Sequence, residues 1–304
     1  MGANSIPRVC VGMPVYNGER WIRESIESIL NQTYPAFDLR ISDNASTDGT
    51  RAICEEYVTR DPRVRYFRND RNVGVFRNYD LAFKRCDADY FKWSAVGDIC
   101  APTFVSRCME VLTSQPDVVL AVPQTVLFDT VVSDGRLYDD DLDLEDASPA
   151  DRFLKFLSRA RLNNVMNGVI RASALRETAL NQVFKSSDIS MIAELALRGK
   201  VVQLPESLYF RRAKPQTATA RKNATELREF FAHEPVSTDS LQTWKLEASL
   251  WRAVLRAPIS WRDRARLYSY VTHRALWSRG ALARELVDYW RQRRGSDAAA
   301  QPRS

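Results

Sequence analysis

The sequence predicts an α/β fold: a mostly parallel, mixed sheet flanked by helices, followed by a helical C-terminal extension. Short apolar runs alternate with segments of helical periodicity through the first 120 residues. Repeated units of this kind, joined by short connections, build a largely parallel sheet with helices on both faces. From about residue 222 the apolar residues recur only at helical spacing. We therefore expect one domain over residues 1–220 and a basic helical extension over residues 221–304.

The first 112 residues hold four expected strands, each followed by a helix. The strands are Arg8–Val15, Phe37–Ser42, Val64–Arg68 and Tyr90–Ala95. The helices are Trp21–Leu30, Thr47–Tyr57, Phe76–Arg85 and Pro102–Leu112. Ligands of such sheets bind beyond the carboxyl ends of the strands. The polar residues that follow these strands are therefore the first candidates for a site.

The second half of the domain is expected to be less regular. Its predicted strands are Val118–Val122, Val126–Val132, Gly168–Arg171, Val201–Leu204 and Ser207–Phe210. Its predicted helices are Phe153–Leu157, Ala172–Leu180 and Ile189–Leu197. The stretch Asp139–Asp146 is strongly acidic, and we expect it to form a mobile loop.

The scarcity of histidine narrows the chemistry. His233 and His273 are the only two in the chain, which argues against histidine-based zinc sites and Ser-His-Asp catalysis. The chemistry must therefore rely on carboxylates. The five cysteines include no CxxC pair, so we expect reduced thiols in a cytosolic protein.

The net charge of +6 is unevenly distributed. Residues 1–220 carry 28 Lys+Arg against 29 Asp+Glu, whereas residues 221–304 carry 16 against 9. A neutral body with a basic tail suggests an anionic surface as partner, either a membrane or a nucleic acid. A solvated basic face is the alternative that the charge count leaves open.

Two carboxylates close predicted strands. Asp43 is followed by a run of small polar residues that can bind a base or ribose, although the same run also suits helix capping. Asp98 follows the fourth strand, where a lone Asp is usually a turn former. Mg²⁺ and Mn²⁺ are often held by one or two carboxylates together with substrate phosphates. Asp98 is thus a candidate metal ligand.

Further charged candidates lie later in the chain. Asp188 stands at a helix start, where the residues alone favour a capping or dipole role. Arg211, Arg212 and Lys214 follow the last expected strand. They are candidates to clamp phosphate oxygens, with surface charge as the alternative.

Four segments together resemble a known family. They are Val9–Asn17 (VCVGMPVYN), Ile41–Asp48 (ISDNASTD), Arg71–Asn78 (RNVGVFRN) and Phe91–Pro102 (FKWSAVGDICAP). Their order and spacing resemble the donor half of family 2 glycosyltransferases, inverting enzymes with the Rossmann-like GT-A fold that make bacterial polysaccharides and glycolipids. The resemblance covers about residues 6–212. It implies a donor half at about 6–115 and an acceptor half at about 116–212.

The resemblance implies a role for each matching position. Pro14, Val15 and Tyr16 would line the nucleobase pocket, while Asp43 would hydrogen-bond the base beside Arg71. Asn78 and Gly97 would complete the donor site. Asp98 matches the last acid of the family's metal motif and would hold Mg²⁺ or Mn²⁺. Asp188 matches the expected catalytic base. The resemblance therefore favours a catalytic role for Asp188 over the capping or dipole role that the residues alone favour.

One position departs from the family pattern. Members commonly show Asp-Asp where this chain has Gly97-Asp98. A catalytically weakened member is therefore an alternative, but we expect activity to survive if Asp98 is the direct ligand. Restoring the acid with Gly97→Asp is expected to leave activity equal or higher.

The implied partners are a nucleotide-diphosphate sugar and a glycan or lipid-linked acceptor. Residues 222–294 suit an anionic membrane surface, which would place the protein on the cytoplasmic face of the cell membrane, and a homodimer stays open. Nucleic acid is not expected, because tryptophans at helical spacing more often pack than stack on bases. The rival readings are a membrane-surface binding module and a nucleotidyltransferase. The latter would usually need a Gly-rich basic loop after the first strand.

Overall fold

The computed structural model describes residues 6–138, 142–213 and 241–299, with side chains described as far as Arg291. Its strands are β1 (Val9–Val15), β2 (Phe37–Asp43), β3 (Val64–Arg68), β4 (Tyr90–Trp93), β5 (Ile99–Cys100), β6 (Val118–Phe128), β7 (Arg136–Leu137), β8 (Val169–Arg171) and β9 (Lys200–Arg212). The helices of the domain are α1 (Ile22–Leu30), α2 (Thr50–Arg60), α3 (Val75–Lys84), α4 (Phe104–Ser114), α5 (Pro149–Arg159), α6 (Ala172–Arg176) and α7 (Ser187–Ala196). Those of the extension are α9 (Gln242–Arg256), α10 (Trp261–Trp277) and α11 (Arg279–Ala299), and two 3₁₀ turns are η1 (Val132–Asp134) and η2 (Asn164–Asn167).

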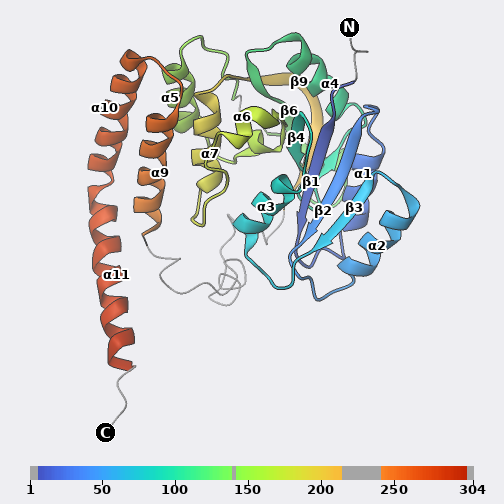
Figure 1. Ribbon diagram of the computed structural model, residues 1–304, viewed down its shortest axis with the longest axis horizontal. Coiled ribbons are helices and arrows are strands. Elements are labelled where there is room, and N and C mark those ends of the chain that lie inside the picture. The colour runs from blue at the N-terminus through green and yellow to red at the C-terminus, as the bar shows by residue number, and fades with distance from the viewer. Residues whose placement is uncertain (1–5, 139–141, 214–240, 300–304) are drawn as a thin grey trace.

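The strands form one sheet in the order β3-β2-β1-β4-β8-β6-β9-β5, with β7 paired to β6. Strands β3, β2, β1 and β4 run parallel, so their carboxyl ends share one edge. Strand β8 is antiparallel to both β4 and β6, whereas β9 is parallel to β6. The predicted mixed, mostly parallel sheet is thus confirmed (Figure 1).

Each face of the sheet packs against its own helices. Val9, Val11 and Met13 alternate along β1 into a core that also holds side chains of α1, α2 and α4. Cys10 points to the opposite core, which contains side chains of α3, α5, α6 and α7. Gly12 faces that second core, where an added Cβ would lie 2.8 Å from the Phe91 ring. The result is a sheet between two helical layers.

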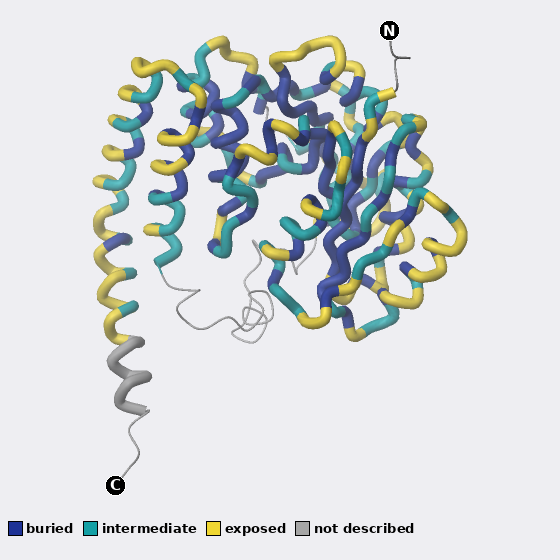
Figure 2. Tube along the Cα trace, viewed as in Figure 1, coloured by how far each residue is buried: buried dark blue, intermediate teal, exposed yellow. Residues whose placement is uncertain are grey.

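The C-terminal helices pack on the second helical layer. Leu250 and Val254 of α9 and Leu267 and Val271 of α10 are buried in the same core as α5 and α7. Helix α9 lies beside α7, and α10 continues into α11, which runs past the body (Figures 1 and 2). The expected boundary at residue 220 lies outside the described residues and stays a prediction. In the described part of the chain, no helix is both long and apolar enough to span a bilayer.

Two predicted pairs of strands are single long strands in the structure. Strand β6 continues through Pro123, and β9 continues through Pro205. The two pair with each other, and their register shifts on either side of Gln124. Such a bulge lets a strand bend without ending the ladder, so proline did not mark a strand end here. The predicted strand residues 129–132 are not part of β6.

The acidic stretch is only partly outside the described residues. Residues 139–141 are not described, but Leu142 and Leu144 are buried, at 3% and 0% exposure. Leu144 forms a backbone bridge with Val201 of β9. The prediction of a mobile loop is wrong for this second part, because alternating leucines anchor it to the sheet.

Two helix boundaries differ from those that the sequence predicts. Helix α2 begins at Thr50 rather than Thr47, because Asp48 accepts hydrogen bonds from the Thr50 amide and hydroxyl, at 3.1 and 2.5 Å. Helix α6 ends at Arg176, and Leu180 adopts a left-handed φ of 54°.

The cysteine prediction is wrong for one pair. Cys10 of β1 and Cys86, just after α3, form a disulfide that spans 76 residues of sequence. Sequence spacing did not reveal it, because the parallel crossover brings the two together. Cys54, Cys100 and Cys108 are free and buried, as expected of structural thiols. The cysteines therefore do not support a cytosolic location.

Candidate functional site

Asp43 closes β2 at the carboxyl edge of the sheet, where it is fully buried. One carboxylate oxygen accepts hydrogen bonds from the amide and hydroxyl of Ser46, at 2.9 and 2.5 Å. The other accepts from the Tyr66 hydroxyl at 2.5 Å. Burial and this contact raise the pKa of Tyr66. Asp43 thus ties β2 to β3 and to the loop that precedes α2.

The turn after β1 is bound to the same loop. Asn17, with a φ of 50°, accepts a hydrogen bond from the Thr47 amide at 2.8 Å. Its own amide donates to the Ser46 hydroxyl at 2.9 Å. Before it, Pro14 and Val15 are buried, whereas Tyr16 is 38% exposed. The aromatic face of Tyr16 is therefore presented to solvent at the strand edge.

Asn78 of α3 joins the ends of β1 and β2. Its side-chain amide donates to the Ser42 carbonyl at 2.8 Å and to the Val15 carbonyl at 3.4 Å. Its oxygen accepts from the Ser42 hydroxyl and from Asn69. These bonds give Asn78 a supporting position beneath the strand ends. Arg71, by contrast, is exposed.

Asp98 follows β4 and is 7% exposed. One carboxylate oxygen accepts from the Tyr209 hydroxyl at 2.5 Å, and the other accepts from the Arg212 amide at 3.1 Å. Burial, together with the Asp98 charge, raises the pKa of Tyr209 well above its usual value. The end of β9 therefore holds the loop that carries Asp98.

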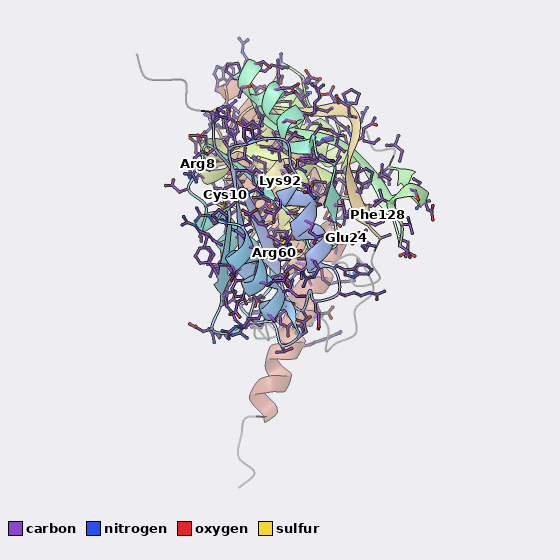
Figure 3. The ribbon with its side chains drawn as sticks, turned by 90° about the vertical axis from the view of Figure 1, so that its right-hand side faces the viewer. Arg8, Cys10, Glu24, Arg60, Lys92 and Phe128 are labelled. Carbon is purple, nitrogen blue, oxygen red and sulfur yellow. A yellow bond between two sulfur atoms is a disulfide. The ribbon has the colours of Figure 1, made fainter. Side chains whose placement is uncertain are left out.

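The Arg212 guanidinium is hydrogen-bonded within the protein and does not present its N–H groups to a ligand. It donates to the Gly97 carbonyl at 3.1 Å and to Glu24 at 2.5 Å, and it also reaches carbonyls of residues 129 and 130. The same group lies over the rings of Trp21 and Phe128, at 3.9 and 4.4 Å. Figure 3 shows Glu24 and Phe128 on the same side of the molecule.

Because all three guanidinium nitrogens of Arg212 have protein acceptors, the expectation that it clamps phosphate is not supported by the geometry. Lys214, the third expected phosphate ligand, lies outside the described residues. Arg211 is therefore the remaining cation of the three with a described position in the site.

Gly97 has a φ of 95°, a backbone conformation that L side chains rarely adopt. Its amide donates to the Ser25 hydroxyl at 2.7 Å, and its carbonyl accepts from Arg212. The backbone itself thus requires glycine here. We therefore revise the expectation that Gly97→Asp would leave activity equal or higher, because the new side chain would strain the backbone.

Asp188 lies in the first turn of α7 and is partly exposed. Its carboxylate accepts a hydrogen bond from the Asn163 amide at 3.0 Å. The next residue, Asn164, accepts from the Arg211 guanidinium at 2.6 Å. Two adjacent asparagines therefore each bind one residue of the pair, the candidate base and the candidate phosphate cation.

The end of β9 links these groups. Arg212 donates its backbone amide to Asp98, and the neighbouring Arg211 donates to Asn164, which follows the Asn163 that binds Asp188. A short series of contacts thus connects Asp98, Arg211 and Asp188, which are separated by up to 113 positions in the sequence. Burial raises the pKa of the Tyr79 phenol on α3 to about 12; Asp98 and then Asp188 act in the same direction, while Arg211 opposes them.

Comparison with known proteins decides the family. Residues 10–184, more than half of the chain, match the family described as Glycosyl transferase family 2. This chain is a member of glycosyl transferase family 2.

The family relatives match over shorter stretches. Chondroitin synthase of Escherichia coli is 31% identical over 105 residues, which are 34% of this chain and 15% of that protein. EpsE of Bacillus subtilis, provisionally named a glycosyltransferase, is 36% identical over 100 residues, or 33% of this chain and 36% of that one. The matched region thus spans about a third or less of these relatives.

Solved structures show the same fold at low identity. Staphylococcus aureus TarS 1–349, solved in complex with UDP, has a TM-score of 0.61 and 13% identity, covering 88% of this chain and 71% of that one. The mannosyltransferase PcManGT of Pyrobaculum calidifontis, solved with GDP-Man and Mn²⁺, has a TM-score of 0.52 and 15% identity, covering 93% and 85%. The predicted GT-A fold is confirmed.

The side chains that could serve as metal ligands in this family 2 site limit how a metal ion would be held. Among the described residues, no group of three or more His, Cys, Asp or Glu side chains is placed to hold a metal ion. Asp98 offers a single carboxylate, and Mg²⁺ often binds one or two carboxylates together with substrate phosphates. Each Asp98 oxygen already accepts a hydrogen bond, although a carboxylate oxygen has two lone pairs, and the side chain is 7% exposed. Asp98 therefore fits a metal held mainly by substrate phosphates and not a cage made by protein alone.

Sequence reasoning missed the residues that join the two halves. Asn163 and Asn164 bind candidate residues, and Asp98 and Asp188 raise the pKa of Tyr79; none of these three residues belongs to a recognised motif. Consecutive asparagines before a predicted strand were a usable signal, because Asn commonly bonds to nearby polar groups in turns. Nothing in the sequence singled out Tyr79, which reads as one position of an amphipathic helix.

Proposed function

We propose that this family 2 member is an inverting glycosyltransferase that moves a sugar from a nucleotide-diphosphate sugar to an acceptor hydroxyl. The observation that carries this proposal is the series of contacts that connects Asp98, Arg211 and Asp188 through the end of β9 and the Asn163–Asn164 pair. A carboxylate base for the acceptor hydroxyl and a cation for the leaving diphosphate are what direct displacement needs.

The donor is assigned to the carboxyl edge of β1–β4. Tyr16 and Arg71 are exposed there and would contact the base, while Pro14 and Val15 would line its pocket. Asp43 and Asn78 hold the strand ends in place. The nucleotides in the TarS and PcManGT structures support a nucleoside diphosphate as the bound group.

Asp188 is assigned as the general base. As the acceptor oxygen attacks the anomeric carbon, Asp188 takes its proton, and the bond from that carbon to the diphosphate oxygen breaks with its electron pair leaving on the diphosphate. Asn163 orients the Asp188 carboxylate by its hydrogen bond. Arg211, held by Asn164, offsets the negative charge that grows on the leaving group.

The asparagine pair also offers groups to the acceptor. Asn163 and Asn164 are 8% and 7% exposed, and the Asn163 side-chain oxygen and the Asn164 side-chain nitrogen have no hydrogen-bond partner among the described residues. Buried polar groups of this kind are normally paired. A hydroxyl-rich acceptor would supply both a donor and an acceptor.

Asp98 is assigned as the residue that would hold Mg²⁺ or Mn²⁺. When bound, such an ion neutralises diphosphate charge as a Lewis acid. Tyr209 and Arg212 fix the Asp98 loop for this purpose. The Mn²⁺ in the PcManGT structure supports a divalent ion.

The acceptor class follows the relatives. The chondroitin synthase match supports a glycan acceptor and a role in polysaccharide biosynthesis at the cell envelope. A nucleotide-sugar donor favours a cytoplasmic active site, whereas the Cys10–Cys86 disulfide favours an oxidising compartment. We assign the cytoplasmic location on the strength of the donor.

A thermal-shift panel tests the donor assignment. Nucleoside diphosphates and nucleotide sugars, with Mg²⁺ or Mn²⁺, should raise the melting temperature, because a ligand of the native state stabilises it. NMR of the product should show the opposite anomeric configuration from the donor. Release of pyrophosphate from a nucleoside triphosphate and a sugar phosphate, without nucleoside diphosphate release from any nucleotide sugar, would instead identify a nucleotidyltransferase.

A further inference from the structure

Helices α10 and α11 form a nearly continuous rod with one outward face. The Ser278 amide donates to the Arg274 carbonyl and the Leu282 amide donates to the Ser278 carbonyl, both at 3.0 Å, so the helical bonding pattern continues across the junction. Leu267, Val271 and Leu282 are the residues buried against the body. The rod spans about 45 Å from residue 261 to residue 291.

The opposite face is exposed along its whole length. Successive positions three or four residues apart lie on one side of a helix. The exposed residues at this spacing are Arg262, Arg266, Ser269, His273, Leu276, Gly280, Arg284, Val287 and Arg291. We call this set, with the flanking exposed residues Trp261, Trp277, Arg279 and Trp290, the outer face of α10–α11. Figure 2 shows the exposed side of this rod along the edge of the molecule.

The outer face combines basic groups with large aromatic groups. Trp261, Trp277 and Trp290 are 75%, 81% and 55% exposed. Leu286, Val287, Trp290 and Arg291 line a surface hollow. Exposed tryptophans beside arginines are typical of helices that lie in a membrane interface, where the rings sit at headgroup level.

Charge is segregated around the rod. Residues 261–291 hold seven arginines and three acids. Asp263 bonds to Ser260 at the start of α10, and Glu285 accepts from Thr243 of α9, so two of the acids are used within the fold. Two arginines of the outer face are paired: Arg266 with Asp151 of α5, and Arg291 with Asp288, the third acid. Arg279 and Arg284 form no ion pair among the described residues. The unpaired charge on this surface is therefore positive.

We propose that the outer face of α10–α11 docks on an anionic lipid bilayer. Charge complementarity favours an anionic bilayer over a second copy of this chain, because the chain itself carries a net charge of +6 and like charges repel. Each arginine near an anionic surface contributes about a fivefold gain in partitioning. Inserted tryptophans add apolar burial that salt does not screen.

The docking also has a structural route to the active site. Helix α9 lies between the rod and α7, which carries Asp188: Ser249 of α9 donates to the Ser190 hydroxyl at 3.0 Å and accepts from Gln182 at 2.9 Å. A bilayer under the rod would bring a lipid-anchored acceptor close to the protein. This consequence, unlike the docking itself, rests on the proposed function.

Sedimentation of the full chain with vesicles tests the docking. The wild type should sediment with vesicles of phosphatidylcholine and phosphatidylglycerol, and much less with phosphatidylcholine alone. Arg279→Glu/Arg284→Glu should weaken binding to anionic vesicles by at least about tenfold. The matched control is Arg51→Glu/Arg60→Glu, the same charge change on exposed arginines of α2 at the opposite side of the molecule (Figure 1), and it should bind nearly as the wild type does.

Trp277→Ala/Trp290→Ala tests the aromatic part. It should weaken binding several-fold even at high salt, with an unchanged melting temperature and an unchanged thermal response to nucleotides. Failure of nucleotides to stabilise the wild type would count against the glycosyltransferase and not against docking. Equal sedimentation of the α10–α11 and α2 charge variants would overturn the proposal. The proposal would also fail if the protein did not bind vesicles but formed a dimer in solution that the tryptophan variant broke. A preference for an oligonucleotide over anionic vesicles would contradict it as well.

Discussion

The donor-side and acceptor-side parts of the site are held in place in different ways. On the donor side, Asp43 is bound by Ser46 and Tyr66, and Asn78 is bound by Ser42. The fold satisfies these groups by itself. On the acceptor side, Asn163 and Asn164 hold Asp188 and Arg211, yet each asparagine keeps an unpartnered buried atom among the described residues.

This difference suggests two kinds of buried polar residue. Donor-side side chains shape the strand ends, so their loss should lower stability and donor affinity together. Acceptor-side side chains orient reacting groups, so their loss should lower turnover with little change in stability. Variants on each side can therefore distinguish a structural role from a role in turnover.

Asn163→Ala should have the largest effect among the variants that leave the candidate base in place. Without its amide, the Asp188 carboxylate is no longer oriented, and a misplaced catalytic group costs about 100-fold in turnover. The KM for the donor should stay within about threefold, because Asn163 contacts Asp188 and not the donor edge of the sheet. Steady-state kinetics measures both kcat and KM.

Asn69→Ala is the matched control on the donor side. Asn69 is also buried, and it bonds to Asn44, Asn78 and Arg85. Its loss should lower the melting temperature and the donor affinity but change kcat little. Equal kcat losses in the two variants would remove the distinction between the two sides.

Asp98→Asn should reduce nucleotide affinity by about tenfold in the presence of Mg²⁺ or Mn²⁺, because one charged ligand is lost. Calorimetric titration with and without the ion measures the effect. The decrease should vanish when the ion is omitted. An equal decrease without metal would assign Asp98 a purely structural role through Tyr209.

Gly97→Asp should destabilise the protein by about 1–2 kcal/mol, since a Cβ is strained at positive φ. Urea denaturation measures this, and Gly97→Ala should cost a similar amount. A stable, more active Asp variant would instead favour the missing family acid over the backbone constraint.

Asp80 gives a smaller effect that depends on pH. Burial raises the pKa of its carboxyl from 3.8 to about 6, although Asn181 donates to it at 3.0 Å. Because the folded pKa lies above the unfolded one, the folded state binds more protons, and stability should fall as pH rises from about 4 to 6. Asp80→Asn should gain about 1 kcal/mol at pH 7 and nothing near pH 4, as urea denaturation at the two pH values would show.

Local sequence patterns predicted the parallel half of the fold well. Alternation of apolar runs and helical periodicity located β1–β4 and their helices to within about three residues. The prediction was poorer where tertiary pairing overrides local signals. Proline interrupts the pattern of β6 and β9, yet the two strands support each other across a bulge. Their continuity depends on contacts about 80 residues apart.

The candidate site was predictable only in part for the same reason. Motif positions identified Asp43, Asp98 and Asp188 as candidates. They did not indicate that Arg212 would lie between Trp21 and Phe128, because that contact joins three distant segments. Nor did they reveal the link from Asn163 to Asp188, which no local spacing encodes.

The most direct test of the account compares Asp188→Asn with Asp151→Asn. Both residues lie in the first turn of a helix, α7 and α5, but Asp151 pairs with Arg266 away from Tyr79. Turnover and nucleotide affinity would be measured for both. Asp188→Asn should lose about 10³-fold in turnover with unchanged nucleotide affinity, while Asp151→Asn should behave as the wild type. Similar small effects in the two variants would show that Asp188 only caps its helix, and would contradict its assignment as the base.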